Sequence, residues 1–130
     1  MIVDASAVIA ILHGEPGAQR LAEAIGAADN VRISSVSIFE ASLKTERSGA
    51  QSAARIFDSF VRDTGMEIVA FEAEHAAIAR DARRRYGKGS GHPAKLNFGD
   101  CMTYATAYIA DEPLLYKGDD FAHTDLKSAL

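Results

Sequence analysis

Cysteine and long apolar runs are what this 130-residue sequence has least of. Its one cysteine, Cys101, excludes an intramolecular disulfide and a zinc site built from several thiolates. No apolar stretch approaches the roughly 20 residues that a membrane-spanning helix needs. The opening run MIVDASAVIAIL lacks a basic leader and is interrupted by Asp4, so we do not expect a signal peptide. These features favour a soluble protein of the reducing cytoplasm, with no membrane partner.

The chain also lacks an excess of positive charge. It carries 14 Lys and Arg residues against 18 Asp and Glu residues, a formal net charge of -4. A protein that coats a nucleic-acid duplex by neutralising phosphates needs a basic face, so that class is not indicated. An acidic total remains compatible with a nucleic-acid enzyme whose acids gather in one cleft.

Short apolar stretches alternate with helical patterns along the chain. Strands are expected within residues 1–3, 31–34, 66–71 and 113–118. Helices are expected within residues 6–14, 15–28, 35–49, 50–65 and 72–87, and in a segment containing Asp100, with Gly49 and Gly65 closing two of them. This alternation predicts one α/β domain over residues 1–130 with a mostly parallel sheet. Ligands of such sheets bind beyond the carboxyl ends of the strands.

Two aspartates fall at the starts of predicted helices, where a purely structural role is also open. Asp4 follows the first strand and is a good N-cap for the next helix. Asp100 lies in the first turn of its helix, where the macrodipole favours a carboxylate, and it points away from the apolar stripe that begins at Phe98.

Glu40 is harder to explain as a surface charge. It falls on the same helical face as three apolar residues, which we expect to be buried: Val36, Phe39 and Leu43. The alternative is a capping box of Ser37 with Glu40. That box requires the helix to begin at Ser37, whereas Ser34 or Ser35 caps the apolar pattern better. A carboxylate on a core-facing stripe needs a cation, hydrogen-bond donors or a shifted pKa.

A further pair of acids, Asp119 and Asp120, follows the last predicted strand, although Gly-Asp there is also ordinary turn chemistry. Three or four carboxylates at strand ends and helix starts repel one another unless a cation lies between them. Mg²⁺ and Mn²⁺ prefer a few carboxylates together with water and substrate phosphate. The pattern therefore indicates metal-assisted phosphodiester hydrolysis, in which the ion lowers the pKa of a bound water.

Four stretches, in order and at suitable spacing, resemble the motifs of PIN-domain nucleases. They are MIVDASAVIAIL with Asp4 and Ser6, SSVSIFEAS around Glu40, HPAKLNFGDCMTYATA around Asp100, and PLLYKGDDFAHTDL near the C-terminus. Within that family the chain is most similar to the VapC-type toxins of bacterial toxin–antitoxin pairs. The resemblance covers nearly the whole chain.

The resemblance implies a PIN-like three-layer domain with four or five short parallel strands. It also implies an endoribonuclease that depends on Mg²⁺, with Mn²⁺ as a substitute, and that a cognate VapB-type antitoxin inhibits. The implied metal ligands are Asp4 and Asp100. Glu40 would complete the catalytic acids, and Ser6 would hydrogen-bond among the groups around the ion.

The fourth catalytic acid is less well defined by the resemblance. Many PIN domains have an acid two residues after the last strand, where this chain has Gly118. Asp119 is the first choice because it follows the strand end directly, and Asp120 is the alternative.

Basic residues precede the helix of Asp100 and are candidates for binding RNA phosphates: Arg83, Arg84, Arg85, Lys88 and Lys95. In that interpretation Tyr86 is available for base stacking. The alternative is a solvated helix end, where cations suit the dipole. Lys117 is either a further phosphate contact or a surface residue.

Apolar residues in segments 6–14 and 22–28 exceed what one small core needs. We therefore expect part of that surface to bind an antitoxin segment or a second copy in a homodimer or larger assembly.

A catalytically silent PIN-like module that binds RNA or protein is the alternative function. A phosphoacceptor receiver domain fits less well. Receiver domains have a pair of adjacent acids near the first strand, whereas the adjacent pair of this chain follows the last predicted strand. A PIN enzyme that cleaves DNA also stays open, because only a contact to the 2′-OH distinguishes the sugar.

Overall fold

Four short strands form one parallel sheet in the computed structural model, which describes residues 1–47 and 49–130. The strands are β1 (Ile2–Val3), β2 (Arg32–Ser34), β3 (Glu67–Val69) and β4 (Leu114–Leu115), in the order β3-β2-β1-β4. Central β1 pairs Ile2 with Arg32 on one side and with Leu114 on the other. The predicted α/β class and parallel sheet are confirmed.

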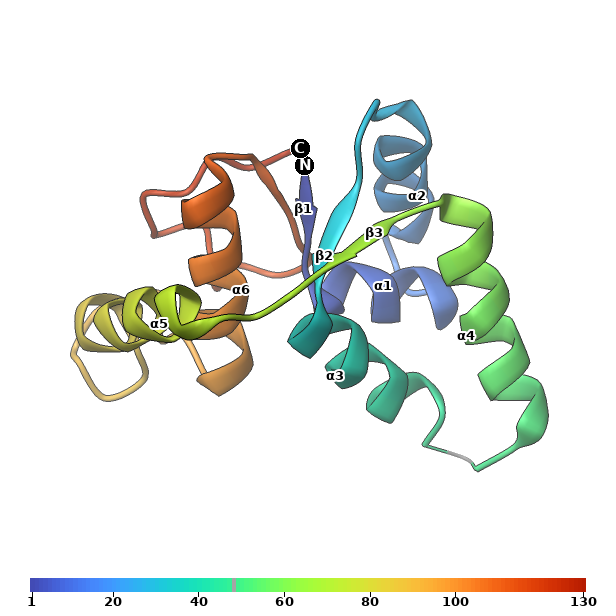
Figure 1. The fold of residues 1–130 in the computed structure, drawn as a ribbon, viewed down its shortest axis with the longest axis horizontal. Coiled ribbons are helices and arrows are strands. Elements are labelled where there is room, and N and C mark those ends of the chain that lie inside the picture. Colours follow the sequence, from blue (N-terminus) through green and yellow to red (C-terminus); the bar gives the residue numbers. More distant parts are fainter. Residues whose placement is uncertain (48) are drawn as a thin grey trace.

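Helices cover both faces of this sheet. They are α1 (Ala5–Leu12), α2 (Ala18–Ala27), α3 (Ser35–Thr45), α4 (Gln51–Thr64), α5 (Ala73–Tyr86) and α6 (Phe98–Ala110). Figure 1 shows α5 and α6 on one side of the strands and α1, α2 and α4 on the other, while α3 lies at the end where β2 finishes. This is the three-layer arrangement that the resemblance to PIN domains implies.

The two faces of the sheet bury different side chains, because successive residues of a strand point in opposite directions. Val3, Ile33 and Leu115 belong to the core shared with the first four helices. Ile2 and Leu114 belong to a second core that is shared with α5 and α6. Strands as short as two residues are enough to form the sheet, because apolar cores on both of its faces hold them in place.

One predicted helix boundary is wrong. The helix expected over residues 35–49 ends at Thr45, and Glu46 is its C-cap. Gly49 has a φ of 66° and donates its N–H to the Glu46 carbonyl at 2.8 Å, so it belongs to the turn that leads into α4. Ser48, inside the expected helix, lies outside the described residues. Gly65, with a φ of 62°, does end α4 as predicted.

Parallel strands bring their carboxyl ends to one edge of the sheet. Asp4 follows β1 there, α3 begins after β2, and Gly118 and Asp119 come soon after β4. The chain termini lie together at the opposite edge (Figure 1), where the N-terminal ammonium pairs with Glu112 at 2.9 Å. Within the described residues, every helix is too short or too polar to cross a bilayer.

Candidate active site

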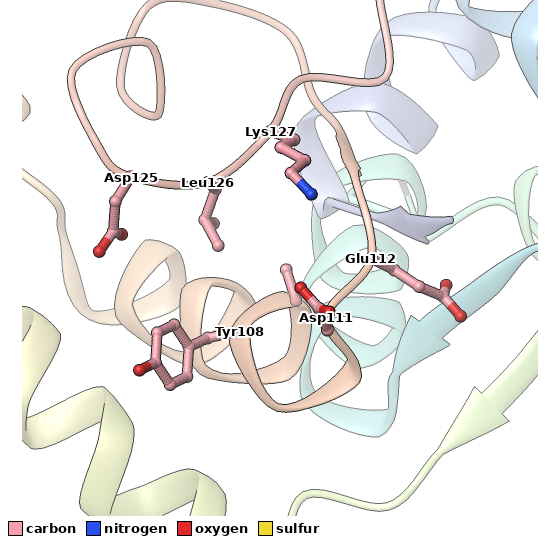
Figure 2. A pocket seen from close by; sticks show the side chains of 7 residues that line it. Tyr108, Asp111, Glu112, Asp125, Leu126 and Lys127 are labelled. Carbon is pink, nitrogen blue, oxygen red and sulfur yellow. The ribbon is translucent and has the colours of Figure 1, made fainter.

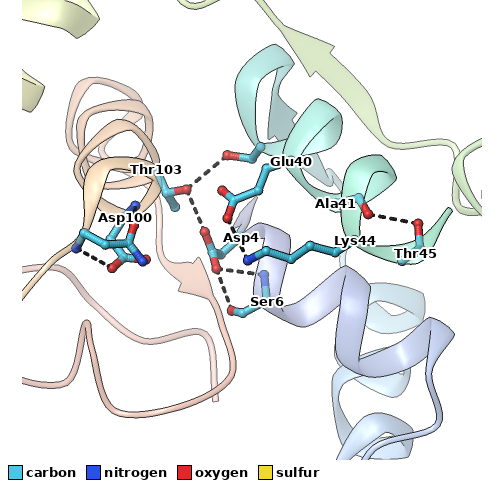
Figure 3. A network of polar contacts seen from close by, with 10 residues as sticks. Asp4, Ser6, Glu40, Ala41, Lys44, Thr45, Asp100 and Thr103 are labelled. Atoms are coloured by element: carbon cyan, nitrogen blue, oxygen red, sulfur yellow. Dashed lines mark hydrogen bonds and ion pairs between the residues drawn. The ribbon is translucent and has the colours of Figure 1, made fainter. Parts of the chain in front are cut away.

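Asp4 lies at the centre of the acidic edge and is 5% exposed. It caps α1, since its Oδ2 accepts the Ser6 N–H at 2.9 Å, and it also accepts the Ser6 hydroxyl at 2.5 Å. Its other oxygen, Oδ1, accepts the Thr103 hydroxyl of α6 at 2.6 Å. The predicted capping role is therefore confirmed, and the same carboxylate faces the neighbouring acids (Figure 3).

Hydroxyl groups link Asp4 to the elements around it. Thr103 Oγ1 lies 3.0 Å from Ser37 Oγ, which comes from α3. Ser6 Oγ accepts the backbone N–H of Lys117 at 3.0 Å, just after β4. One carboxylate thus has hydrogen-bonded connections to α1, α3, α6 and the segment after β4.

Glu40 reaches this edge from α3, but not on the face that the sequence predicts. Phe39 and Leu43 are 62% and 58% exposed, so the expected burial of their stripe is wrong. The residues of α3 that face the core are small, Ser37 and Ala41, because α3 packs closely against α1 and α6. Glu40 lies between the two faces and is partly buried.

The start of α3 excludes the capping-box interpretation of Glu40. The helix begins at Ser35, and the N-cap is Ser34, whose hydroxyl accepts the Val36 N–H at 3.2 Å. The carboxylate of Glu40 instead accepts the Lys44 ammonium at 2.9 Å. It also lies against Gly99 at the start of α6, where an added Cβ would clash with Glu40 Oε2. A glycine at that position lets the carboxylate approach the helix N-terminus, which attracts negative charge.

Asp100 forms a capping box with Asn97 at the start of α6. Its Oδ2 accepts the Asn97 N–H at 2.7 Å, and its own N–H donates to Asn97 Oδ1 at 3.0 Å. Burial raises the pKa of Asp100 from 3.8 to about 6; the Asn97 N–H opposes this rise, and the charges of Asp4, Asp120 and Glu40 add to it. Burial is thus the main cause of the raised pKa, and repulsion by acids from three other segments adds to it.

Asp119 and Asp120 are both exposed in the turn after β4, which Gly118 opens with a φ of 99°. The buried ring of Phe121 anchors this turn against the second core. Asp120 is among the charges that raise the pKa of Asp100. This places Asp120 within electrostatic reach of the other acids.

Lys44 is a member of the site that the sequence analysis missed. Its hydrogen bond to Glu40 raises its pKa; burial opposes this, and the charges of Glu40, Asp4 and Asp100 add to it. In Figure 3 its side chain extends along the acidic cluster toward Glu40 and Asp4. The available signal was the spacing of four residues from Glu40 along one helix.

Thr103 and Ser37 were missed as well. Thr103 lies three residues after Asp100, and Ser37 lies three residues before Glu40, so each shares a helical face with an acid. The available signal for Thr103 was a hydroxyl group within the largely apolar run CMTYATA, and for Ser37 it was the spacing of three residues from Glu40.

The predicted phosphate-binding cations differ in exposure and in whether they are paired with a carboxylate. Lys88 and Lys95 are exposed in the loop before α6. Arg84 pairs with Asp81 at 3.2 Å, and Arg85 pairs with Asp125 at 3.0 Å.

Lys117 also has a partner, because its ammonium binds Glu15 at 2.6 Å. Tyr86, expected to be open for base stacking, is buried beside Tyr104 and His92, so that expectation is wrong. Its ring belongs to the second core.

An apolar groove of about 400 Å³ borders the acids between α3 and α6. Its exposed walls are Phe39, Leu43 and Phe98, and Glu40 forms part of its edge. The surplus apolar surface was expected on α1 and α2. Among the described residues, however, the large exposed apolar side chains lie outside α1 and α2. Val8, Leu21 and Ile25, which belong to those two helices, are buried in the first core.

A separate pocket of about 360 Å³ lies at the other end of α6, beside the C-terminal segment (Figure 2). Two of its three carboxylates, those of Glu112 and Asp125, have cationic or hydroxyl partners. Glu112 pairs with the N-terminal ammonium and with Arg32, while Asp125 accepts the Tyr104 hydroxyl at 2.6 Å and binds Arg85. These acids hold the termini in place rather than face one another.

The oxygen donors at the acidic edge suit a hard divalent cation. Among residues 1–47 and 49–130, no three His, Cys, Asp or Glu side chains are placed to bind one ion together. Mg²⁺ keeps several waters and needs only one or two carboxylates, so Asp4 and Asp100 fit its demands. The pKa of Asp100 is raised chiefly by burial and further by the charges of Asp4, Asp120 and Glu40, and a cation beside these acids would offset both effects.

Comparison with known proteins gives a consistent result. Residues 1–127 match the PIN domain family. Ribonuclease VapC42 of Mycobacterium tuberculosis is 45% identical over 129 residues, 99% of this chain and 98% of the relative.

Solved structures with the same fold include M. tuberculosis VapC20, described as a sarcin-ricin loop cleaving toxin. Its TM-score is 0.76 at 15% identity, over 96% of this chain and 95% of that one. A toxin–antitoxin complex from Klebsiella pneumoniae has a TM-score of 0.71 at 18% identity, over 99% and 97% of the two chains.

Proposed function

Because the chain belongs to the PIN domain family, we propose that it is a divalent-metal-dependent endoribonuclease, the toxin of a cytoplasmic toxin–antitoxin pair. The observation that carries the proposal is the placing of several acids at one edge of the sheet, where burial, with the charges of Asp4, Asp120 and Glu40 added, raises the pKa of Asp100 to about 6. A relative that is 45% identical over nearly its whole length is named a ribonuclease.

We propose Mg²⁺ as the cofactor, with Mn²⁺ as a substitute, held by Asp4 and Asp100. When bound, such an ion lowers the pKa of a coordinated water and offsets charge on the phosphate. Asp4 is fixed by three hydrogen bonds, which suits a permanent ligand. Burial, with the neighbouring acids, raises the pKa of Asp100, and a cation bound in place of the proton would stabilise its charged form.

Glu40 and one acid of the last turn complete the proposed catalytic group. Lys44 holds Glu40 Oε1 and leaves Oε2 beside the start of α6. Asp119 was the first choice for the fourth acid, but its neighbour Asp120 is the one that acts on the pKa of Asp100. We therefore propose Asp120, and a comparison of Asp119→Asn with Asp120→Asn tests this choice.

RNA is the proposed substrate. Lys88 and Lys95 are exposed and remain the best candidates for phosphate contacts away from the acids. Arg84, Arg85 and Lys117 each have a carboxylate partner, so their binding to phosphate requires an ion pair to open. Lys44 supplies a positive charge inside the acidic cluster.

Two protein partners are part of the proposal. The fold shared with a toxin–antitoxin complex supports a VapB-type antitoxin.

A second copy of the chain is proposed to cover the groove bounded by Phe39, Leu43 and Phe98. The groove is lined almost entirely by uncharged residues, so two copies meet there without repulsion in a self-complementary interface. Sedimentation of Phe98→Asp is expected to show a monomer where the wild type is a dimer, and a monomeric wild type would refute the dimer.

The decisive experiment uses purified, antitoxin-free protein and end-labelled bacterial RNA with Mg²⁺, Mn²⁺ or a chelator. Discrete fragments are expected for the wild type with metal and for the control Asp58→Asn, whose exposed carboxylate lies on α4. Fragments are expected to disappear with chelator and for Asp100→Asn. If neither metal supports cleavage while RNA or a partner protein still binds, the chain is a silent binding module instead.

A further inference from the structure

A buried chain of hydroxyl groups ends on Asp4. Ser37 and Thr103 are each 1% exposed, and their oxygens lie 3.0 Å apart. Thr103 Oγ1 in turn lies 2.6 Å from Asp4 Oδ1. Neither hydroxyl has a role in the proposed function as described above.

The direction of these hydrogen bonds follows from the donors and acceptors available. A carboxylate accepts only, so the Thr103 hydroxyl must donate its hydrogen to Asp4 Oδ1. With its hydrogen used, Thr103 Oγ1 must accept from the hydroxyl of Ser37. The order of donation is therefore Ser37, then Thr103, then Asp4.

The same count of donors and acceptors fixes which part of Asp4 is left for a ligand. A carboxylate has about four acceptor positions, two on each oxygen. Oδ2 accepts both the N–H and the hydroxyl of Ser6, so its two positions are filled. Oδ1 accepts from Thr103 and has one position left.

We propose that Ser37 and Thr103 are positioning residues that turn Asp4 so that it binds the divalent ion through Oδ1 alone. The proposal rests on the proposed function, because it assumes that Asp4 is a metal ligand. It adds that the orientation of Asp4 is set by the two helices that carry the other acids. Thr103 is one turn after Asp100 on α6, and Ser37 is one turn before Glu40 on α3.

Valine tests Thr103 directly, because it keeps the branched shape of threonine and replaces the hydroxyl with a methyl group. A matched control is Thr106→Val on the same helix. Thr106 is also buried, but its hydroxyl donates at 3.0 Å to the Met102 carbonyl and not to an acid. Ser37→Ala removes the earlier donor, and Thr103→Ser keeps the hydroxyl at position 103.

The measurement is the Mn²⁺ affinity of each purified protein without RNA, by electron paramagnetic resonance titration, together with the melting temperature with and without Mn²⁺. Groups that orient metal ligands typically contribute roughly 10- to 100-fold in metal affinity. Thr103→Val is therefore expected to bind Mn²⁺ about 10- to 100-fold more weakly. Thr103→Ser is expected to restore most of the affinity, Ser37→Ala to lose several-fold, and Thr106→Val to match the wild type.

Two other results would each overturn the proposal in a distinguishable way. If Thr103→Val and Ser37→Ala lower the melting temperature but keep the wild-type Mn²⁺ affinity, the hydroxyl chain is structural only. If the wild type itself binds no Mn²⁺, the metal dependence in the proposed function is wrong, and the inference is wrong as well because it assumes that Asp4 is a metal ligand. Should Thr103→Val not fold, Ser37→Ala still decides between these outcomes, because it removes the donor to Thr103.

Discussion

Replacing Asp100 with Asn is expected to stabilise the metal-free protein at neutral pH but not at pH 4. Burial, with the charges of Asp4, Asp120 and Glu40, raises the pKa of Asp100 from 3.8 to about 6. An asparagine has no charge to bury or to repel. Its side-chain oxygen still accepts the N–H of Asn97, so the start of α6 keeps its cap.

The size and sign of the effect follow from the pKa. A pKa that differs by one between the folded and unfolded states corresponds to about 1.36 kcal/mol, so a rise of about two sets an upper limit near 3 kcal/mol. Partial exposure and solvent screening reduce this to about 1–2 kcal/mol. Because the folded-state pKa lies above the unfolded value, Asp100 costs nothing below about pH 4. Its cost appears as the pH rises from about 4 to about 6.

Urea unfolding with a chelator, from pH 4 to pH 8, measures this difference. The free energy of unfolding of Asp100→Asn minus that of the wild type is expected to grow by about 1–2 kcal/mol across this range. The control Asp58→Asn is expected to show a constant difference. Excess Mg²⁺ is expected to stabilise the wild type and not Asp100→Asn. A difference that is independent of pH, or that shrinks as the pH rises, would refute the reasoning.

Three further predictions concern Lys44, Gly99 and Tyr104. Lys44→Met removes the ammonium beside Glu40 and is expected to tighten Mn²⁺ binding several-fold at low salt in calorimetric titrations. If the variant and the wild type bind Mn²⁺ equally well, the ammonium does not compete with the metal ion for the acids. Gly99→Ala favours helix α6 by about 1 kcal/mol but displaces the Glu40 carboxylate, so RNA cleavage should fall at least about tenfold with no loss of melting temperature. Tyr104→Phe removes the hydrogen bond to Asp125 and should cost about 1–2 kcal/mol of stability in thermal melts, while the cleavage rate stays near that of the wild type.

The positions of the acids were predictable because they follow from strand order. Asp4 and the Asp119–Asp120 pair follow strands, and parallel strands end at one edge, so their approach needs no side-chain detail. The orientation of α3 was not predictable in this way. Hydropathy selects the face of Phe39 and Leu43, but close packing against α1 selects the face of Ser37 and Ala41.

Partners distant in the sequence account for the other errors. The sequence shows that Lys117 is a cation near the acids, but its partner Glu15 lies 102 positions earlier. Arg85 is likewise held by Asp125, 40 positions later. Thr103 and Asp4, separated by 99 positions, meet only when α6 packs against the end of β1. Contacts of this kind depend on the angles between layers, and local sequence patterns do not encode those angles.

The central position of β1 also determines when the acidic edge can form during synthesis. The first residues of the chain make the middle strand, and Asp4 donates its backbone N–H to Leu115 at 2.9 Å. Translation delivers the N-terminus first, so Asp4 leaves the ribosome long before the segment that must lie beside it. The acidic edge therefore cannot assemble until the segment after β4, which carries Asp119 and Asp120, has been synthesised and has packed beside β1.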